Sequence, residues 1–176
     1  MKTRVIHTAE EADVLIVALS KSAEHAVEQL KELLQQNRAL QALEEIKFRR
    51  IGCDPLDTDR PLNFMEQLNQ TFTYLASAKA VKTLMALHPT LAPFTLNLGT
   101  APGSDIESAH GELAAEVFSA VSTSSNSKLA NDRQKVSQTS ATIKYVFFMC
   151  PDIGPGRQPK LEREAGVEVW SVGEEK

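Results

Sequence analysis

The chain has 176 residues, a length that suits one domain with a sizeable buried core. Its hydrophobic fraction of 42% and charged fraction of 24% are ordinary for globular proteins, which excludes a disordered, fibrous or coiled-coil chain. The net charge of −4 excludes a strongly basic protein that coats polyanions, but it is compatible with a local basic patch for nucleic acid.

Neither a membrane span nor an export signal is predicted. The apolar runs Val14–Leu19 and Tyr145–Met149 are far shorter than the roughly 20 residues that cross a bilayer. Glu10, Glu11 and Asp13 stand where a signal peptide needs an unbroken apolar stretch. We therefore expect a soluble, cytoplasmic protein without a membrane partner.

The first part of the chain is predicted to be helical. Thr8 and Glu11 have the spacing of a capping box, and the absence of proline and glycine extends the predicted helix to about Phe48. The run Asp13–Leu19 is also compatible with a short buried strand, because period alone does not assign so brief an apolar segment. We treat residues 1–50 as an N-terminal helical extension within a single domain of residues 1–176.

Five leucines in this extension recur at three- and four-residue steps: Leu30, Leu33, Leu34, Leu40 and Leu43. Such spacing forms an apolar stripe on one side of a helix. The stripe predicts packing either on the rest of the chain or on a second chain, which would make a homo-oligomer through the N-terminal helices.

Residues 51–60 combine Gly52, Pro55 and three aspartates without periodicity, which predicts a turn-rich connector. Pro61 then fits the first turn of a second helix over residues 62–88. Pro89 is expected to end that helix.

The chain after this helix has the pattern of a sheet. Short alternating or β-branched stretches separated by glycines predict a three-stranded antiparallel meander at residues 94–98, 104–108 and 112–121. A polar loop, a helix that begins at Lys128 and a strongly apolar strand should follow, with the strand in the same sheet. The apolar strand covers residues 143–150, and it is followed by a Gly/Pro-rich loop at 152–159, a short helix at 160–165 and a final strand at 167–172.

The order helix, three strands, helix, strand over residues 62–172 resembles the core of the PD-(D/E)xK nuclease superfamily, which has the restriction-endonuclease-like α/β fold. In that family an Asp opens the second strand and an acidic residue begins the (D/E)xK triplet on the third. Asp105 and Glu116 match those places. The resemblance implies that the pair binds Mg²⁺ or Mn²⁺ through hard oxygen ligands. It also implies cleavage of DNA phosphodiester bonds, with Glu66 on the preceding helix as a further metal ligand.

The family's catalytic lysine is replaced by Phe118 in this chain. That lysine normally positions the attacking water and offsets charge that develops on the phosphate. Lys128 and Lys135 are the two candidate replacements, because they lie seven residues apart on the predicted helix and share a face. Loss of the lysine is equally typical of an inactive member of the family.

Three functions therefore fit the sequence: a Mg²⁺-dependent DNA endonuclease, an inactive nuclease-fold module that binds nucleic acid or protein, and an interaction protein that pairs through its N-terminal helices. Asp105 follows Pro-Gly-Ser and is also typical of a turn, and Glu66 of a helix surface. Glu116 lies in a largely apolar strand, where a carboxylate is costly unless it is paired or bound to metal.

Overall fold

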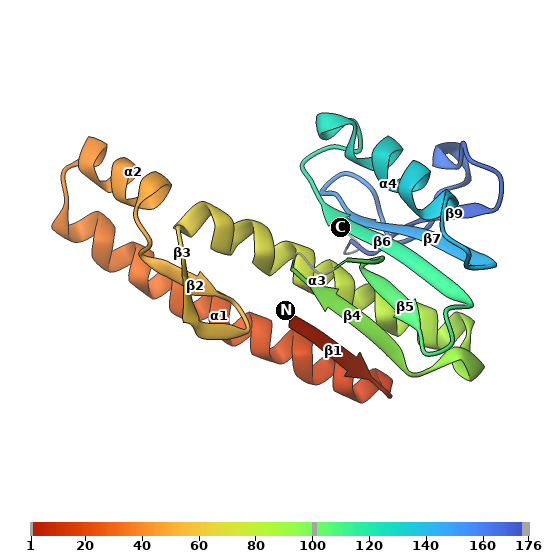
Figure 1. Cartoon of the computed structure of the whole chain (residues 1–176). Helices are drawn as coiled ribbons and strands as arrows, with labels where there is room; N and C mark the ends of the chain where they lie inside the picture. Colours follow the sequence, from red (N-terminus) through yellow and green to blue (C-terminus); the bar gives the residue numbers. More distant parts are fainter. Residues whose placement is uncertain (1, 100–101, 174–176) are drawn as a thin grey trace. The chain divides into compact units, whose positions relative to one another are not determined.

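A computed structural model describes residues 2–99 and 102–173 (Figure 1). The chain divides into two compact units. The first unit contains Met1–Asp13 and Ala76–Lys176, and the second contains Val14–Leu75. Two long helices, α1 (Ala9–Gln36) and α3 (Phe64–Leu87), contribute residues to both units.

The first unit is built on a seven-stranded sheet with the order β1-β4-β5-β6-β7-β9-β8. The strands are β1 (Lys2–Ile6), β4 (Phe94–Leu98), β5 (Ile106–Ser108), β6 (Leu113–Ser119), β7 (Ile143–Met149), β8 (Gly156–Arg157) and β9 (Val167–Ser171). The three strands β4, β5 and β6 pair antiparallel, whereas β6, β7 and β9 are parallel neighbours. The predicted meander, joined by the strand near residues 143–150, is therefore confirmed.

Helices cover both faces of this sheet (Figure 1). On one face lies α4 (Lys128–Ser137), which begins at Lys128 as predicted from the sequence and packs against β6 and β7. Its buried side chains Leu129 and Val136 join Phe118 and Phe148 of the strands in one apolar cluster. The second half of α3 covers the opposite face with fully buried small and branched side chains: Ala76, Ala80, Val81 and Leu84. This two-sided cover explains why β6 is buried along almost its whole length.

Three predictions for the first unit need correction. Residues 2–6 are not helical but form the edge strand β1, in which Ile6 pairs with Phe94. A strand of five residues is too short to show a clear alternation of apolar and polar residues, and its partner lies about 90 residues further along the chain. The expected helix over 160–165 shrinks to the 3₁₀ turn Pro159–Leu161, and β8 forms inside the predicted loop.

The second unit contains the helices of the N-terminal extension and a β-hairpin. The expected continuous helix is two helices, α1 and α2 (Ala39–Phe48), and the run Asp13–Leu19 is helical within α1. Asn37 lies between the two helices. Its side-chain amide donates a hydrogen bond to the carbonyl of Leu33, which satisfies a carbonyl at the end of α1. Residues predicted as a connector form the antiparallel strands β2 (Gly52–Asp54) and β3 (Asp57–Leu62). β3 includes Pro61, which therefore does not lie in the first turn of α3 as predicted, since α3 begins at Phe64.

A buried carboxylate holds this hairpin together and against α3. Asp54 is fully buried, and its Oδ1 accepts a hydrogen bond from the backbone N–H of Leu56 at 2.9 Å. Its Oδ2 lies 3.2 Å from Arg60 Nη1 and 3.2 Å from the hydroxyl of Tyr74 on α3. The turn chemistry of Asp54 thus explains why an aspartate-rich segment folds as a hairpin.

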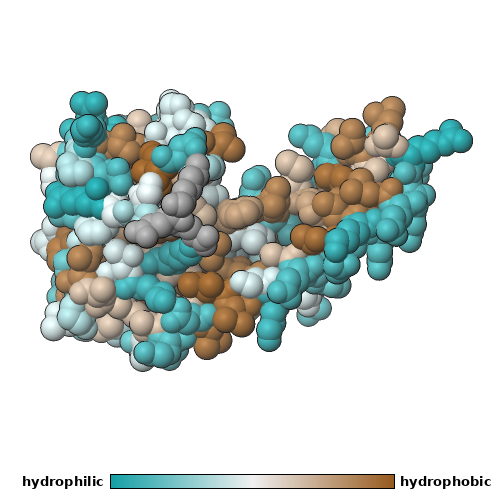
Figure 2. Space-filling model, turned by 180° about the vertical axis from the view of Figure 1, so that it is seen from behind, coloured by the Kyte–Doolittle hydropathy of each residue, from teal (hydrophilic) through white to brown (hydrophobic). Residues whose placement is uncertain are grey.

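The predicted leucine stripe is only partly covered in the second unit. Leu30 and Leu33 are half-buried, whereas Leu40 and Leu43 are 72% and 60% exposed. Leu40 and Leu43 line a surface hollow of about 370 Å³ together with Phe48 and other side chains of α2 and α3. Brown, hydrophobic atoms gather on this part of the surface in Figure 2, beside rows of teal hydrophilic ones. We name the exposed side chains of Leu40, Leu43, Phe48 and Met65 the α2 apolar surface.

Candidate functional site

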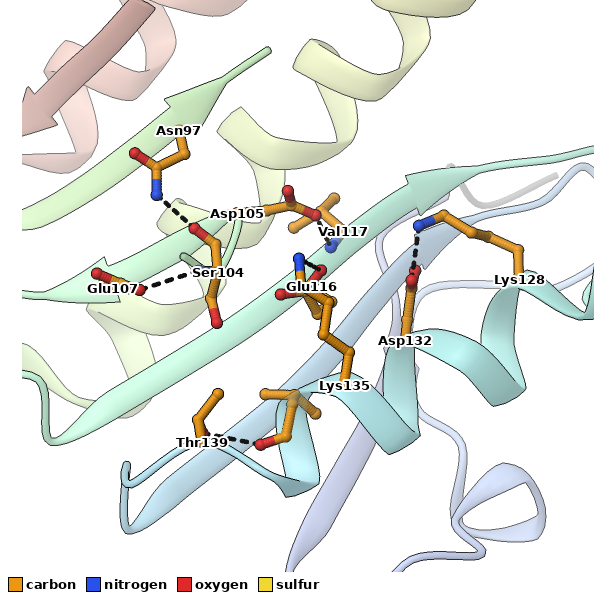
Figure 3. Close-up of polar contacts among 11 residues, drawn as sticks. Asn97, Ser104, Asp105, Glu107, Glu116, Val117, Lys128, Asp132, Lys135 and Thr139 are labelled. Carbon is orange, nitrogen blue, oxygen red and sulfur yellow. Dashed lines mark hydrogen bonds and ion pairs between the residues drawn. The ribbon is translucent and has the colours of Figure 1, made fainter. Parts of the chain in front are cut away.

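The site predicted on the sheet begins with two carboxylates: Asp105 directly before β5, and Glu116 in the adjacent strand β6. β5 pairs with β6 so that Ile106 lies opposite Ala115, and one further step along this register brings Asp105 beside Glu116. Glu116 lies in the buried strand β6, and its side chain is only 1% exposed although it is acidic. The Oδ2 of Asp105 accepts a hydrogen bond from the backbone N–H of Val117 at 2.7 Å (Figure 3). The structure thus brings together the two acidic residues named from the sequence.

Polar contacts fix the loop that delivers Asp105. Asn97 Nδ2 donates to the carbonyl of Ser104 at 2.5 Å, and the backbone N–H of Ser104 donates to Glu107 Oε1 at 2.9 Å (Figure 3). Gly103 has φ +110°, and a Cβ at this position would meet Glu107 Oε1 at 2.9 Å. Only glycine adopts this conformation without strain, so it holds the loop close to β4 and β5.

A lysine reaches the carboxylates from α4. Lys135 Nζ donates to Glu116 Oε2 at 2.7 Å (Figure 3). Phe118, where the sequence resemblance would place a lysine, is instead buried and stacks on Phe148 with ring centroids 5.8 Å apart. Lys128, the second candidate from the sequence, pairs with a different carboxylate, Asp132. Of the two candidates, Lys135 is therefore the one that contacts the predicted pair.

The sequence reasoning missed Asp132. This residue is 3% exposed and occupies the inward stripe of α4 with Leu129 and Val136. A charged residue in an apolar stripe at three-residue spacing is a signal that was available in the sequence. Its Oδ1 accepts from Lys128 Nζ at 2.6 Å.

Burial dominates the electrostatics of these groups. It raises the pKa of Asp105, which the Val117 hydrogen bond and the two lysines only partly offset. Burial and the charge of Asp105 together raise the pKa of Glu116, against the opposing effect of Lys135. Burial lowers the pKa of Lys135, but its hydrogen bond to Glu116 and the acidic neighbours outweigh this, so that its pKa rises. Negative charge on the two buried carboxylates is therefore unfavourable, and the two lysines compensate for it only in part.

The donor set fits a divalent cation. Glu116 Oε1 is buried and has no hydrogen-bond partner within the described ranges, so an oxygen ligand is free beside Asp105. Residues 2–99 and 102–173 contain no group of three His, Cys, Asp or Glu side chains arranged to hold a metal directly. Mg²⁺ commonly takes one or two carboxylates and keeps several waters, which this pair satisfies.

Glu66 lies in the second unit and has a local role. Its backbone N–H donates to Asn63 Oδ1 at 2.8 Å, while its Oε2 accepts from the backbone N–H of Asn63 at 3.2 Å. This reciprocal pair is a capping box at the start of α3. The cap accounts for the side chain of Glu66, and its part in metal binding stays a prediction.

The fold and the site together define a mixed α/β protein with an acidic, lysine-bearing cluster between its sheet and α4. Comparison with protein-family models, with curated proteins and with solved structures finds no match to this chain. Among the described helices, none combines the length and apolar character that a bilayer crossing requires.

Proposed function

We propose that the chain is a divergent PD-(D/E)xK-type protein that hydrolyses DNA phosphodiester bonds with Mg²⁺ or Mn²⁺. One observation carries the proposal: Lys135 Nζ lies 2.7 Å from the buried Glu116, beside Asp105. The lysine absent from position 118 is thus supplied in space by a residue seventeen positions further along the chain. The element order from α3 to β7 agrees with the core that the family uses.

Each side chain has a defined part in the proposed reaction. Asp105 and Glu116 would bind the cation, which supplies Lewis acidity toward the phosphate when it is present. The ammonium of Lys135 would orient the attacking water and offset the charge that builds on the phosphoryl oxygens. Lys128, which is 47% exposed, would contact the DNA backbone from the start of α4.

A plasmid-nicking assay tests this function. Wild type should nick supercoiled DNA with Mn²⁺ and not with EDTA, and Asp105→Asn should abolish nicking. Lys135→Met should lower the rate by about 10²–10³-fold, the usual loss when one preorganised donor to a transition state is removed. Lys160→Met removes an exposed charge outside the site and should nick at the wild-type rate.

A second candidate function rests on Phe118. Because this residue is fixed in the core on the α4 side of the sheet, the chain has lost the family's usual lysine position. An inactive nuclease-fold module that binds nucleic acid or protein would keep the carboxylates without cleavage. Cation binding by wild type without nicking under any tested metal would favour this second function over the first.

A further inference from the structure

Asp132 carries an unsatisfied oxygen at a buried position of α4. Its side chain is 4% exposed, and its Oδ2 has no hydrogen-bond partner among the described residues, whereas Oδ1 accepts from Lys128. A buried carboxylate oxygen without a donor is costly. The arrangement therefore points to a ligand that supplies either a hydrogen-bond donor or positive charge.

Helix stability does not account for this carboxylate. Lys128 precedes Asp132 by four residues, which is the less favourable order for an ion pair on a helix. Lys128 is also 47% exposed, so solvent screens its charge and weakens its attraction for Asp132. Burial is the main cause that raises the pKa of Asp132, so the pair does not offset the cost of placing the charge there. Perturbed buried carboxylates of this kind cluster at functional sites.

A second unsatisfied oxygen lies in the same group of charges. Glu116 Oε1 is buried and without a partner in the described part of the chain. Asp132 precedes Lys135 by three residues on α4, and Lys135 Nζ lies 2.7 Å from the other oxygen of this carboxylate, Glu116 Oε2. Figure 3 shows the Lys128–Asp132 pair on the turns of α4 that precede Lys135. The three carboxylates therefore act on one region of space, and two lysines leave one negative charge over.

We propose that Asp132 is a third acidic residue of the cation site and that it holds the ion through its shell of water. The inference rests on the proposed metal site at Asp105 and Glu116. Contact through water follows because no three such side chains converge for direct coordination within the described residues, while Mg²⁺ retains several waters. Carboxylates outside the direct ligand set fix such ions, and their loss typically weakens binding 10- to 100-fold.

The test is the dissociation constant for Mn²⁺, measured by the electron paramagnetic resonance signal of the free ion. Asp132→Asn should raise it by about 10- to 100-fold. Lys128→Met removes a positive charge that competes with the cation for Asp132, so this variant should lower the dissociation constant. Asp13→Asn removes an exposed carboxylate paired with Lys82 on other elements and should leave it unchanged.

The opposite signs separate a cation role from a structural one. If Asp132 only stabilised α4 through Lys128, both variants would lose folding stability and neither would change the Mn²⁺ constant. Hexamminecobalt(III), which does not exchange its ammonia ligands for carboxylates, should also bind more weakly to Asp132→Asn; unchanged binding of this ion would overturn contact through the hydration shell.

The outcomes also distinguish this inference from the proposed function. Wild-type binding that Asp105→Asn abolishes and Asp132→Asn leaves within a factor of two would overturn the role of Asp132 alone. Weaker Mn²⁺ binding by Lys128→Met would also overturn the role of Asp132 alone. No Mn²⁺ binding by wild type would overturn the metal site of the proposed function itself.

Discussion

The Asp105 carboxylate has the least compensated charge in the site. It accepts one backbone hydrogen bond, from Val117, while the two nearby lysines pair with other carboxylates. Its pKa is raised mainly by burial, which means that the folded chain carries the charged form of Asp105 at a cost in free energy. A neutral amide at this position should therefore suit the metal-free protein at least as well as the carboxylate does.

Asp105→Asn should consequently leave the free energy of unfolding at pH 7 in EDTA equal to or above that of wild type. Urea denaturation measures this value, with Asp13→Asn as a control that should change it by less than about 0.5 kcal/mol. A loss of more than about 1 kcal/mol in Asp105→Asn would mean that the carboxylate makes a favourable contact in the metal-free state.

Tyr74 offers a pH-dependent test in the second unit. Burial and the neighbouring Asp54 raise the pKa of Tyr74 from 10.0 to about 12, so the hydroxyl stays neutral in the folded chain while the unfolded chain ionises first. This contribution to stability is present below pH 10 and is lost as pH rises toward 12. At 1.36 kcal/mol per pKa unit it is at most about 3 kcal/mol.

Tyr74→Phe should be less stable than wild type at pH 8, by about 1–3 kcal/mol, because Asp54 loses a hydrogen-bond donor. The difference between the two proteins should shrink as pH rises above 10. Urea denaturation between pH 8 and pH 11.5 measures it, and a difference that stays constant over that range would contradict the coupling to Asp54.

At the scale of elements, α4 is the part that carries the lysines and the third carboxylate. Leu129 anchors its first turn in the core beneath Phe118 and Phe148. Leu129→Ala should lower the free energy of unfolding by about 2–5 kcal/mol, as core leucine truncations do. Gln134→Ala on the exposed side of α4 should change it by less than about 0.5 kcal/mol. Equal effects of the two changes in urea denaturation would show that α4 is not anchored through Leu129.

The α2 apolar surface gives a second test at this scale. Leu40 is 72% exposed, so Leu40→Asp should change the free energy of unfolding of the dilute chain by less than about 0.5 kcal/mol. Leu33 is half-buried, and Leu33→Asp should cost clearly more. A homo-oligomer through this surface stays a prediction, and sedimentation of wild type and Leu40→Asp over a range of concentrations tests it. A large loss in the dilute Leu40→Asp chain would mean that α2 packs on its own chain.

For the whole molecule, elements with strong local signals were predicted from the sequence, whereas the strands β1, β2 and β3 were not. The helix near residues 64–87 and the apolar strand near 143–149 were confirmed, because periodicity and proline boundaries lie within each segment. β1 and the hairpin β2–β3 were missed, since their pairing partners and the buried Asp54 are not visible in local pattern.

The candidate site followed the same division. Asp105 and Glu116 could be named from strand order, and the structure places Asp105 directly before β5 and Glu116 in the neighbouring strand β6. Spacing places both lysines on one helical face and does not distinguish them. Only the packing of α4 on the sheet shows that Lys135, and not Lys128, contacts Glu116. Asp132 was missed although its place between Leu129 and Val136 was visible in the sequence; the packing of α4 on the sheet shows that it is buried.

The most direct test of the central claim, that Asp105 and Glu116 hold a divalent cation, is the melting temperature as a function of Mn²⁺ concentration. An ion that binds only the folded chain stabilises it by mass action, so the wild-type melting temperature should rise steadily with Mn²⁺ concentration. Asp105→Asn and Glu116→Gln should melt at a temperature that Mn²⁺ does not change. An unchanged wild-type melting temperature, or an equal rise in all three proteins, would contradict the site.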